Sequence, residues 1–383
     1  MTSVVGKSSG TVFRLDPSAD IGRGTEGVVY RAGDVAVKVY FAALDDTAIA
    51  KIDTLLRFAR VVPGVAWPTD TVHETAGGKP VGFVMTLATG ESLEALMNAR
   101  QTAAMSPEQK IAVAESIAAS VAAAHAARGL RMCLGDVLKA GNIVVDGDTA
   151  TLVDAASVNL YGFRAADGSL IDAAENLVTP GYVPPEVLSH PQAKPSRAAD
   201  LFALGVVLFE LIFGRSPTEP RPCAAAVGLD PNDAVQRGLF VRYITHPDFG
   251  PPRYDAVAVP QEIEDLFRAA FLGAPHQRPN ASEWLSRLKA WRVSLAPAPT
   301  TGPSSATSDW WSRVAEIGGR LDRVAVVVLA AVSVLLIGRW VINDAPALVH
   351  QAKLRLFPPK SVPAEKPIPS KPVGPQSFQE LFK

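Results

Sequence analysis

The chain has 383 residues, of which 48% are hydrophobic and 20% are charged, with 37 basic and 38 acidic side chains. This composition excludes a wholly disordered chain, and the length allows two or three domains. A net charge of −1 provides no overall basic field, so we do not expect nucleic acid as a partner. The two cysteines form no CxxC pair, which excludes a cysteine zinc site and a disulfide framework.

The first 88 residues divide into a short arm and a strand-rich unit. Residues 1–10 mix a lysine, serines and glycines with few apolar residues, which predicts a flexible arm. Within 11–88 the β-branched runs predict strands at 11–13, 28–30, 35–40 and 81–87.

Residues 89–295 follow a helical period, and one further helix is expected inside the strand-rich unit. The predicted helices cover 45–59, 106–127, 200–213, 261–272 and 281–291. A small β-rich unit followed by a larger helical unit predicts an α+β fold with two lobes.

A glycine-rich stretch precedes the predicted strand that carries Lys38. Gly22, Gly24 and Gly27 have GxGxxG spacing, and Val28 begins a β-branched run. In a dinucleotide-binding fold such glycines open a helix, whereas here a strand follows them. A strand, glycine turn and strand can lie close over a triphosphate, and a lysine on the next strand can pair with its oxygens. Taken alone, Lys38 would be an ordinary surface lysine.

At these residues the chain resembles the protein kinase superfamily, and the stretch GFVMTLATGESL extends the resemblance. It implies that ATP is bound, that Met85 is the gatekeeper side chain, and that the backbone of Thr86, Leu87 and Ala88 meets the adenine. Without the resemblance, Met85 would be a core methionine.

The stretch LGDVLKAGN is similar to the catalytic loop of that family, and LVD to its metal-binding strand. The resemblance implies that Asp136 is the catalytic base and that Lys139 steadies the γ-phosphate. It also implies that Asn142 and Asp154 hold Mg²⁺. Phosphoryl transfer has a loose transition state, so a carboxylate orients the attacking hydroxyl while the metal neutralises phosphate charge.

Two dipeptides depart from the family pattern. Leu134-Gly135 stands where the family has His-Arg, and Ala155-Ala156 stands where it has Phe-Gly. Position 135 offers no cation to hold a phosphorylated activation segment. We therefore expect activity that does not require phosphorylation of that segment.

The helix expected at 45–59 lacks the glutamate that pairs with the strand lysine in active kinases. Asp53 is the nearest substitute, although it is one methylene shorter. Alternatively, Asp53 is a solvated partner of Arg57 at helical spacing.

The stretch TPGYVPPE, from Thr179 to Glu186, resembles the substrate-binding loop of serine/threonine kinases. Asp200 then resembles the start of their central buried helix. By the same resemblance Arg278 pairs with Glu186 in a buried ion pair.

The C-terminal part is expected to contain no further enzymatic domain. Residues 296–322 are rich in proline, serine and threonine and predict a linker, and 343–383 predict a flexible tail. The apolar run at 323–342 is long enough for one transmembrane helix, provided Arg339 reaches the interface; a buried core helix is the alternative. Because ATP is supplied in the cytosol, we expect the catalytic domain there.

Taken together, the sequence resembles a divergent member of the bacterial, membrane-anchored serine/threonine protein kinases. It predicts ATP-dependent phosphorylation of a protein substrate, with ATP and Mg²⁺. An ATP-binding pseudokinase that serves as a membrane-anchored scaffold is the alternative, and a small-molecule kinase is disfavoured by the loop 179–186. The sequence does not indicate an oligomeric state.

Overall fold

The structure is a computed structural model that describes most of residues 2–295. The described residues are 2–58, 62–75, 77–127, 131–164, 167–174, 179–190, 192, 194–218, 232, 235, 240 and 259–295. The described residues belong to one compact unit, Met1–Ala298. The predicted linker (296–322), membrane span (323–342) and tail (343–383) lie outside the described residues. Within the described part, no helix is both long and apolar enough to cross a bilayer.

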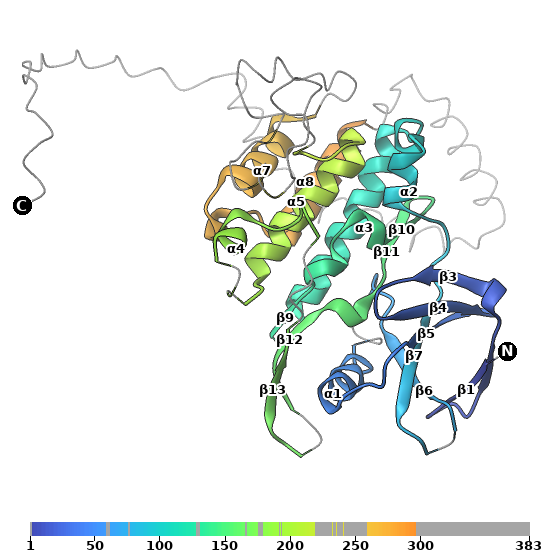
Figure 1. The fold of residues 1–383 in the computed structure, drawn as a ribbon. Coiled ribbons are helices and arrows are strands. Elements are labelled where there is room, and N and C mark those ends of the chain that lie inside the picture. Colours follow the sequence, from blue (N-terminus) through green and yellow to red (C-terminus); the bar gives the residue numbers. More distant parts are fainter. Residues whose placement is uncertain are drawn as a thin grey trace, which may run out of the picture. The chain divides into compact units, whose positions relative to one another are not determined.

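The N-terminal part of this unit is a curled antiparallel sheet of seven strands (Figure 1). Their order across the sheet is β2-β1-β6-β7-β5-β4-β3. The strands are β1 (Thr2–Gly6), β2 (Val12–Leu15), β3 (Asp20–Arg23), β4 (Gly27–Ala32), β5 (Val35–Tyr40), β6 (Pro68–His73) and β7 (Pro80–Thr86). The predicted strands are confirmed, because β-branched residues favour this pleated, half-buried surface.

The expected flexible arm over 1–10 is wrong. Strand β1 pairs with both β2 and β6, and Val4 is only 1% exposed. The turn after β1 is fixed as well, since the Asp70 carboxylate accepts hydrogen bonds from the backbone N–H groups of Ser8 and Ser9 at 3.0–3.1 Å. Because these partners are about sixty residues away in sequence, local composition gave no sign of them.

Helix α1 (Asp46–Leu55) packs on the sheet and is the helix predicted at 45–59. The Asp45 side chain caps its N-terminus by accepting from Ala48 N at 2.7 Å. Its apolar face, including Ile52, joins Ala36, Phe83 and Met85 in one buried cluster. A short apolar face on a ten-residue helix therefore fixes α1 against the central strands.

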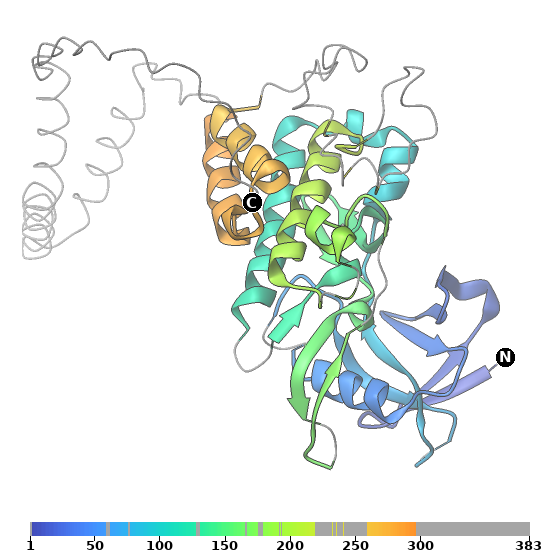
Figure 2. The ribbon, with the colours of Figure 1, turned by 60° about the vertical axis from the view of Figure 1, so that its left-hand side comes forward.

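The larger C-terminal part is helical and confirms the predicted two-lobed α+β architecture. Its helices are α2 (Leu93–Asn98), α3 (Pro107–Ala126), α4 (Pro185–Ser189), α5 (Arg197–Phe213), α7 (Gln261–Leu272) and α8 (Ala281–Leu295). Ser106 and Ser196 cap α3 and α5, which is why both helices begin at the next residue. Helix α3 packs against α5 and α8, and Figure 2 shows α5 at the centre of the helical lobe. Its Phe202 and Phe209 lie in the main core with Trp284.

Two small sheets interrupt the helical part, and the sequence did not predict them. One contains β8 (Glu91–Ser92), β10 (Ile143–Asp146) and β11 (Thr149–Leu152). The other contains β9 (Arg131–Cys133), β12 (Asn159–Arg164) and β13 (Leu170–Ala173). The β12–β13 hairpin extends to α1 in both views (Figures 1 and 2), and the two elements are in contact. These short strands hold the segments 134–142 and 153–158, in which the predicted catalytic residues lie.

Candidate active site

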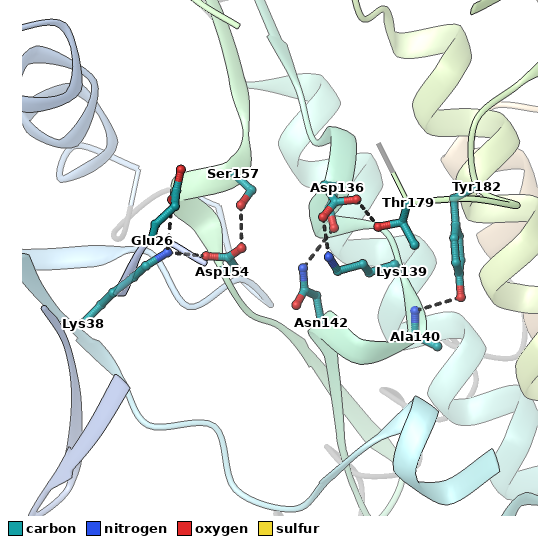
Figure 3. A network of polar contacts seen from close by, with 10 residues as sticks. All are labelled: Glu26, Lys38, Asp136, Lys139, Ala140, Asn142, Asp154, Ser157, Thr179 and Tyr182. Atoms are coloured by element: carbon teal, nitrogen blue, oxygen red, sulfur yellow. Dashed lines mark hydrogen bonds and ion pairs between the residues drawn. The ribbon is translucent and has the colours of Figure 1, made fainter. Parts of the chain in front are cut away.

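Asp136 is the centre of one network of polar contacts. It lies in a short 3₁₀ turn between β9 and β10. One carboxylate oxygen accepts a hydrogen bond from Lys139 Nζ, and the other accepts from Thr179 Oγ1 at 2.5 Å. Asn142 Nδ2 donates to the backbone oxygen of Asp136 at 2.9 Å. The structure thus brings four of the predicted site residues together (Figure 3).

Asp200 fixes the backbone of the segment that contains Asp136. Its carboxylate is 1% exposed and accepts hydrogen bonds from the backbone N–H of Leu134 at 2.8 Å and of Gly135 at 2.9 Å. His125 Nε2 lies 2.8 Å from the same carboxylate. Asp200 therefore fixes the backbone that precedes Asp136. His125 was missed as a site residue, since no sequence signal connects it with Asp200.

Gly135 has a structural reason to lack a side chain. Its φ is +56°, and a Cβ at this position would lie 2.5 Å from the side-chain nitrogen of Asn159. Asn159 comes from β12, which pairs with β9 through Cys133. The space beside Gly135, where the resemblance predicts an arginine side chain, is thus occupied by Asn159 of β12.

Lys38 and Asp154 form a second network. Lys38 lies on β5 with its side chain 9% exposed, and its Nζ is 2.7 Å from Asp154 Oδ1. Ser157 Oγ donates to the other carboxylate oxygen of Asp154 at 2.5 Å. Asp154 has a φ of +60°, a left-handed conformation that is uncommon for a residue with a side chain. Such strained backbone is concentrated at functional sites.

The two networks are linked through the backbone. The N–H of Val153 donates to the backbone oxygen of Asn142 at 2.8 Å. This bond ties Asn142 to the residue that precedes Asp154. Lys38 and Asp154 are therefore linked to Asn142 and Asp136 across the two lobes by one backbone hydrogen bond, and their convergence around a nucleotide stays a prediction.

Asp53 does not take the place of the missing helix glutamate. It is exposed on α1, whereas the carboxylates within 4.0 Å of Lys38 Nζ belong to Asp154 and Glu26. The expected substitute is wrong, because the buried face of α1 is apolar apart from Lys51 and Thr54. The alternative pair with Arg57 is not seen either: Arg57 donates to Thr54 Oγ1 at 3.2 Å.

Glu26 is the functional candidate that sequence reasoning missed. Its Oε2 lies 4.0 Å from Lys38 Nζ, and Figure 3 shows this contact beside the contact of Lys38 with Asp154. The available signal was its position, directly before the last glycine of the GxGxxG stretch.

The glycine-rich stretch forms the expected strand, turn and strand. Gly22 lies in β3 and Gly27 is the first residue of β4. Between them, Gly24 N donates to Gly27 O at 3.0 Å. A Cβ at Gly27 would lie 2.3 Å from the backbone oxygen of Val39, so a side chain there would separate β4 from β5. Val28, the next residue, is 3% exposed. Gly22 and Gly24 are both exposed.

The predicted adenine segment continues from β7. Met85 is 5% exposed and packs with Ala36 in the cluster beneath α1, so it is a core methionine. Thr86 ends β7 and is exposed, whereas Leu87 and Ala88 are half-buried.

The predicted ion pair between Glu186 and Arg278 is formed, but only Arg278 is buried, because the Glu186 side chain is 34% exposed. Two guanidinium nitrogens lie 2.6 and 2.7 Å from the two carboxylate oxygens. The Arg278 side chain is 2% exposed and also donates to the backbone oxygen of Ala198 at 2.8 Å. This bidentate pair fixes the end of the 179–186 loop against α5.

Tyr182 connects that loop to both the catalytic segment and α5. Its hydroxyl donates to Glu210 Oε2 at 2.6 Å and accepts from the backbone N–H of Ala140 at 3.2 Å. Burial, helped by the nearby Glu94 carboxylate, raises the pKa of Glu210 to about 7 although the hydrogen bond from Tyr182 lowers it. Burial also raises the pKa of the Tyr182 hydroxyl, so it stays protonated as the donor.

A pocket opens beside the catalytic segment. Its lining includes Asp136, Thr179, Tyr182, Val183 and Val187. An acceptor side chain placed here would meet the Asp136 carboxylate, and mostly apolar groups from the 179–187 segment would surround it.

Comparison with known proteins identifies the part of the chain that carries these features. The protein kinase domain family model matches residues 16–288. Strands β1 and β2 therefore both lie before the matched region.

Several bacterial kinases are among the similar curated proteins. Protein kinase YegI of Escherichia coli is 27% identical over 304 residues, which are 72% of this chain and 44% of the relative. Serine/threonine-protein kinase PknE of Mycobacterium tuberculosis is 29% identical over 312 residues, covering 76% of this chain and 51% of the relative. Serine/threonine-protein kinase PkaB of Streptomyces coelicolor is 27% identical over 298 residues, with coverages of 72% and 62%. The chain spans about half the length of the relatives it matches.

Proposed function

Because this chain belongs to the protein kinase family, we propose that it transfers the γ-phosphate of ATP to serine or threonine side chains of a protein. The observation that carries this proposal is the contact of Asp136 with both Lys139 and Thr179. A carboxylate, a lysine and a threonine of the substrate-side loop then meet at the point where an acceptor hydroxyl has to be oriented.

The residues suggest how the transfer is divided among them. The acceptor hydroxyl donates to Asp136, which takes its proton as the oxygen bonds to the γ-phosphorus. The bond to the bridging oxygen breaks, and ADP leaves. Lys139 balances the negative charge on the transferred group, and Lys38 binds the phosphates that stay with ADP.

The donor set fits Mg²⁺. Asp154 offers a carboxylate on a side chain that is 30% exposed. Asn142 offers its amide oxygen, because its amide nitrogen already donates to the backbone oxygen of Asp136. Magnesium prefers hard oxygen ligands and uses few from the protein when phosphates supply the others. Its chemical contribution when bound would be to neutralise phosphate charge.

The same residues motivate a second candidate function, an ATP-binding scaffold without turnover. Lys38 is held by Asp154 itself and has no acidic partner on α1, and Ala155-Ala156 follows the metal aspartate. If Asp154 stayed on Lys38 after nucleotide bound, it would hold metal poorly.

A transfer assay with the purified full-length chain distinguishes the two functions. With Mg²⁺ and γ-labelled ATP, the enzyme forms labelled phosphoserine or phosphothreonine in itself or in a generic protein acceptor, and Asp154→Asn abolishes the label. A scaffold instead shows a higher melting temperature with ATP but no label. Ligand at 100 times its dissociation constant adds about 2.7 kcal/mol. Label on tyrosine alone would contradict the serine/threonine assignment.

We further propose that the chain is tethered to a membrane by the apolar run at 323–342, with the kinase domain in the cytosol. The composition of this run and of the flanking 296–322 supports the proposal. Protease added to intact cells should then remove the tail at 343–383. A full-length chain that stays in the supernatant after membranes are sedimented, or a tail protected from external protease, would contradict it.

A further inference from the structure

The buried ammonium of Lys38 requires negative charge nearby. With its side chain 9% exposed, Lys38 has lost most of its contact with water, and a buried charge is costly unless it is paired. The two acids of α1 do not meet this need, because Asp46 and Asp53 are both exposed. Among the described residues, the carboxylates within 4.0 Å of Lys38 Nζ are those of Asp154, at 2.7 Å, and Glu26, at 4.0 Å.

Glu26 is held by its backbone, not by its side chain. Its backbone oxygen accepts from Phe41 N at 2.8 Å, at the end of the strand that carries Lys38. Gly27 directly after it pairs with Tyr40 on the same strand. The backbone at Glu26 is therefore fixed relative to Lys38. Its side chain is 44% exposed and makes the 4.0 Å contact without a hydrogen bond, so it is free to turn away.

The position of Glu26 conflicts with the charge of the nucleotide. If Lys38 binds phosphate oxygens, as the proposed function requires, those oxygens approach the same ammonium that the Glu26 carboxylate now faces. A carboxylate and a polyphosphate repel each other at this distance. Mg²⁺ would reduce the charge of the nucleotide and thus the repulsion.

We propose that Glu26 competes with nucleotide phosphates for Lys38 and thereby selects for nucleotide that arrives with its metal ion. This proposal rests on the proposed function of the site. Before nucleotide binds, the Glu26 carboxylate supplies part of the charge that Lys38 needs. On binding, phosphates replace it, and metal-free nucleotide is disfavoured more strongly than the magnesium complex.

Equilibrium binding to the full-length chain tests the proposal, with ATP, ADP and adenosine as probes, each with Mg²⁺ and with EDTA. Glu26→Gln should bind metal-free ATP about two- to fivefold more tightly than the unmodified chain, the range expected for a partly exposed charge pair. The gain should be smaller for Mg·ATP and absent for adenosine, which has no phosphate. It should decrease at high ionic strength.

Two further variants serve as controls. Asp34→Asn removes an equal charge from the exposed turn at the far end of the same two strands and should leave all affinities unchanged. Glu26→Asp keeps the charge on a shorter side chain and should restore most of the discrimination.

Equal or weaker binding of metal-free ATP by Glu26→Gln would overturn the proposal, as would an equal gain for adenosine. The proposed function fails in a different way, since the unmodified chain would then bind no nucleotide or transfer no phosphate. Loss of nucleotide binding in the unmodified chain would remove this inference as well.

Discussion

The substrate side and the nucleotide side of the site hold their charges differently. Below Asp136, the carboxylate of Asp200 is 1% exposed and the side chain of Arg278 is 2% exposed, and each has several partners. Around Lys38, the Asp154 side chain is 30% exposed and that of Glu26 is 44% exposed. Under the proposed function, nucleotide phosphates would bind Lys38 and the metal ion would bind Asp154, so both contacts of Lys38 would have to change. The contacts of Asp200 and Arg278 thus fix the substrate side, whereas nucleotide or metal could replace the contacts of Lys38 on the nucleotide side.

This difference has a physical basis. A buried charge with a removed partner is strongly destabilising, so the contacts of Asp200 and Arg278 resist change. An exposed charge is partly solvated and loses little when its partner moves. The predictions below test whether the two sides differ in this way, beginning with the largest expected effect.

Glu186→Gln should lower the free energy of unfolding by about 3–5 kcal/mol, because it leaves the Arg278 guanidinium buried without its counter-charge. Urea denaturation at neutral pH measures the loss. Glu283→Gln, at an exposed position in α8, is the matched control and should change stability by less than about 0.5 kcal/mol. A loss below about 1 kcal/mol for Glu186→Gln would show that the substrate side is not fixed by this pair.

The stability of the folded chain should depend on the ionisation of Glu210. Its pKa is raised from 4.5 to about 7, so between these values the native state keeps a proton that the unfolded state loses. The contribution is therefore fully present below about pH 4.5 and is lost as the pH rises through about 7, with a size on the order of 3 kcal/mol. Glu210→Gln should flatten this part of the stability profile. Identical profiles for the two proteins between pH 5 and 8 would rule out a titrating Glu210.

Gly135→Ala should lower the free energy of unfolding by about 1–2 kcal/mol, because position 135 has a positive φ and an added Cβ approaches Asn159. Thermal unfolding measures the loss, and Gly147→Ala is the control, since Gly147 has a φ of +57°, one degree from that of Gly135, with open space around it. A larger loss at 135 than at 147 reports the contact with Asn159. Equal losses would mean that backbone strain alone requires glycine.

Asp53→Asn should have the smallest effect, with less than about 0.5 kcal/mol in stability and no change in nucleotide affinity, because its carboxylate is exposed and away from Lys38. Calorimetric titration with Mg·ATP checks this. A severalfold loss of affinity would show that α1 moves inward when nucleotide binds.

Much of the fold was predictable because its elements carry local signals. Helices α3 and α5 have serine caps at Ser106 and Ser196, and β4 and β5 have β-branched runs. Strands β1 and β12 were not predicted, because each also pairs with a strand distant in sequence, β1 with β6 and β12 with β9. Pairing of this kind depends on the tertiary fold and not on intrinsic propensity.

The candidate site was predictable where one residue type serves one task. Lys38 contacts Asp154 and Asn142 contacts Asp136, and the Glu186–Arg278 pair is formed, whereas convergence of the first four residues around a nucleotide stays a prediction. The partner of Lys38 was predicted wrongly, because helical spacing places Asp53 on a helix without saying which face is buried. Glu26 was overlooked because only the pairing of β4 with β5 brings this turn residue close to Lys38.

The central claim is that the connected set from Lys38 to Asp136 performs phosphoryl transfer. The most direct measurement compares Mg·ATP affinity and phosphate transfer in the full-length chain and in Asp136→Asn. We predict that the variant keeps the nucleotide affinity within about twofold and loses at least about a hundredfold in transfer, as expected for a missing general base. Transfer by Asp136→Asn at the unmodified rate would contradict the account, and so would an unmodified chain that binds Mg·ATP but never transfers its phosphate.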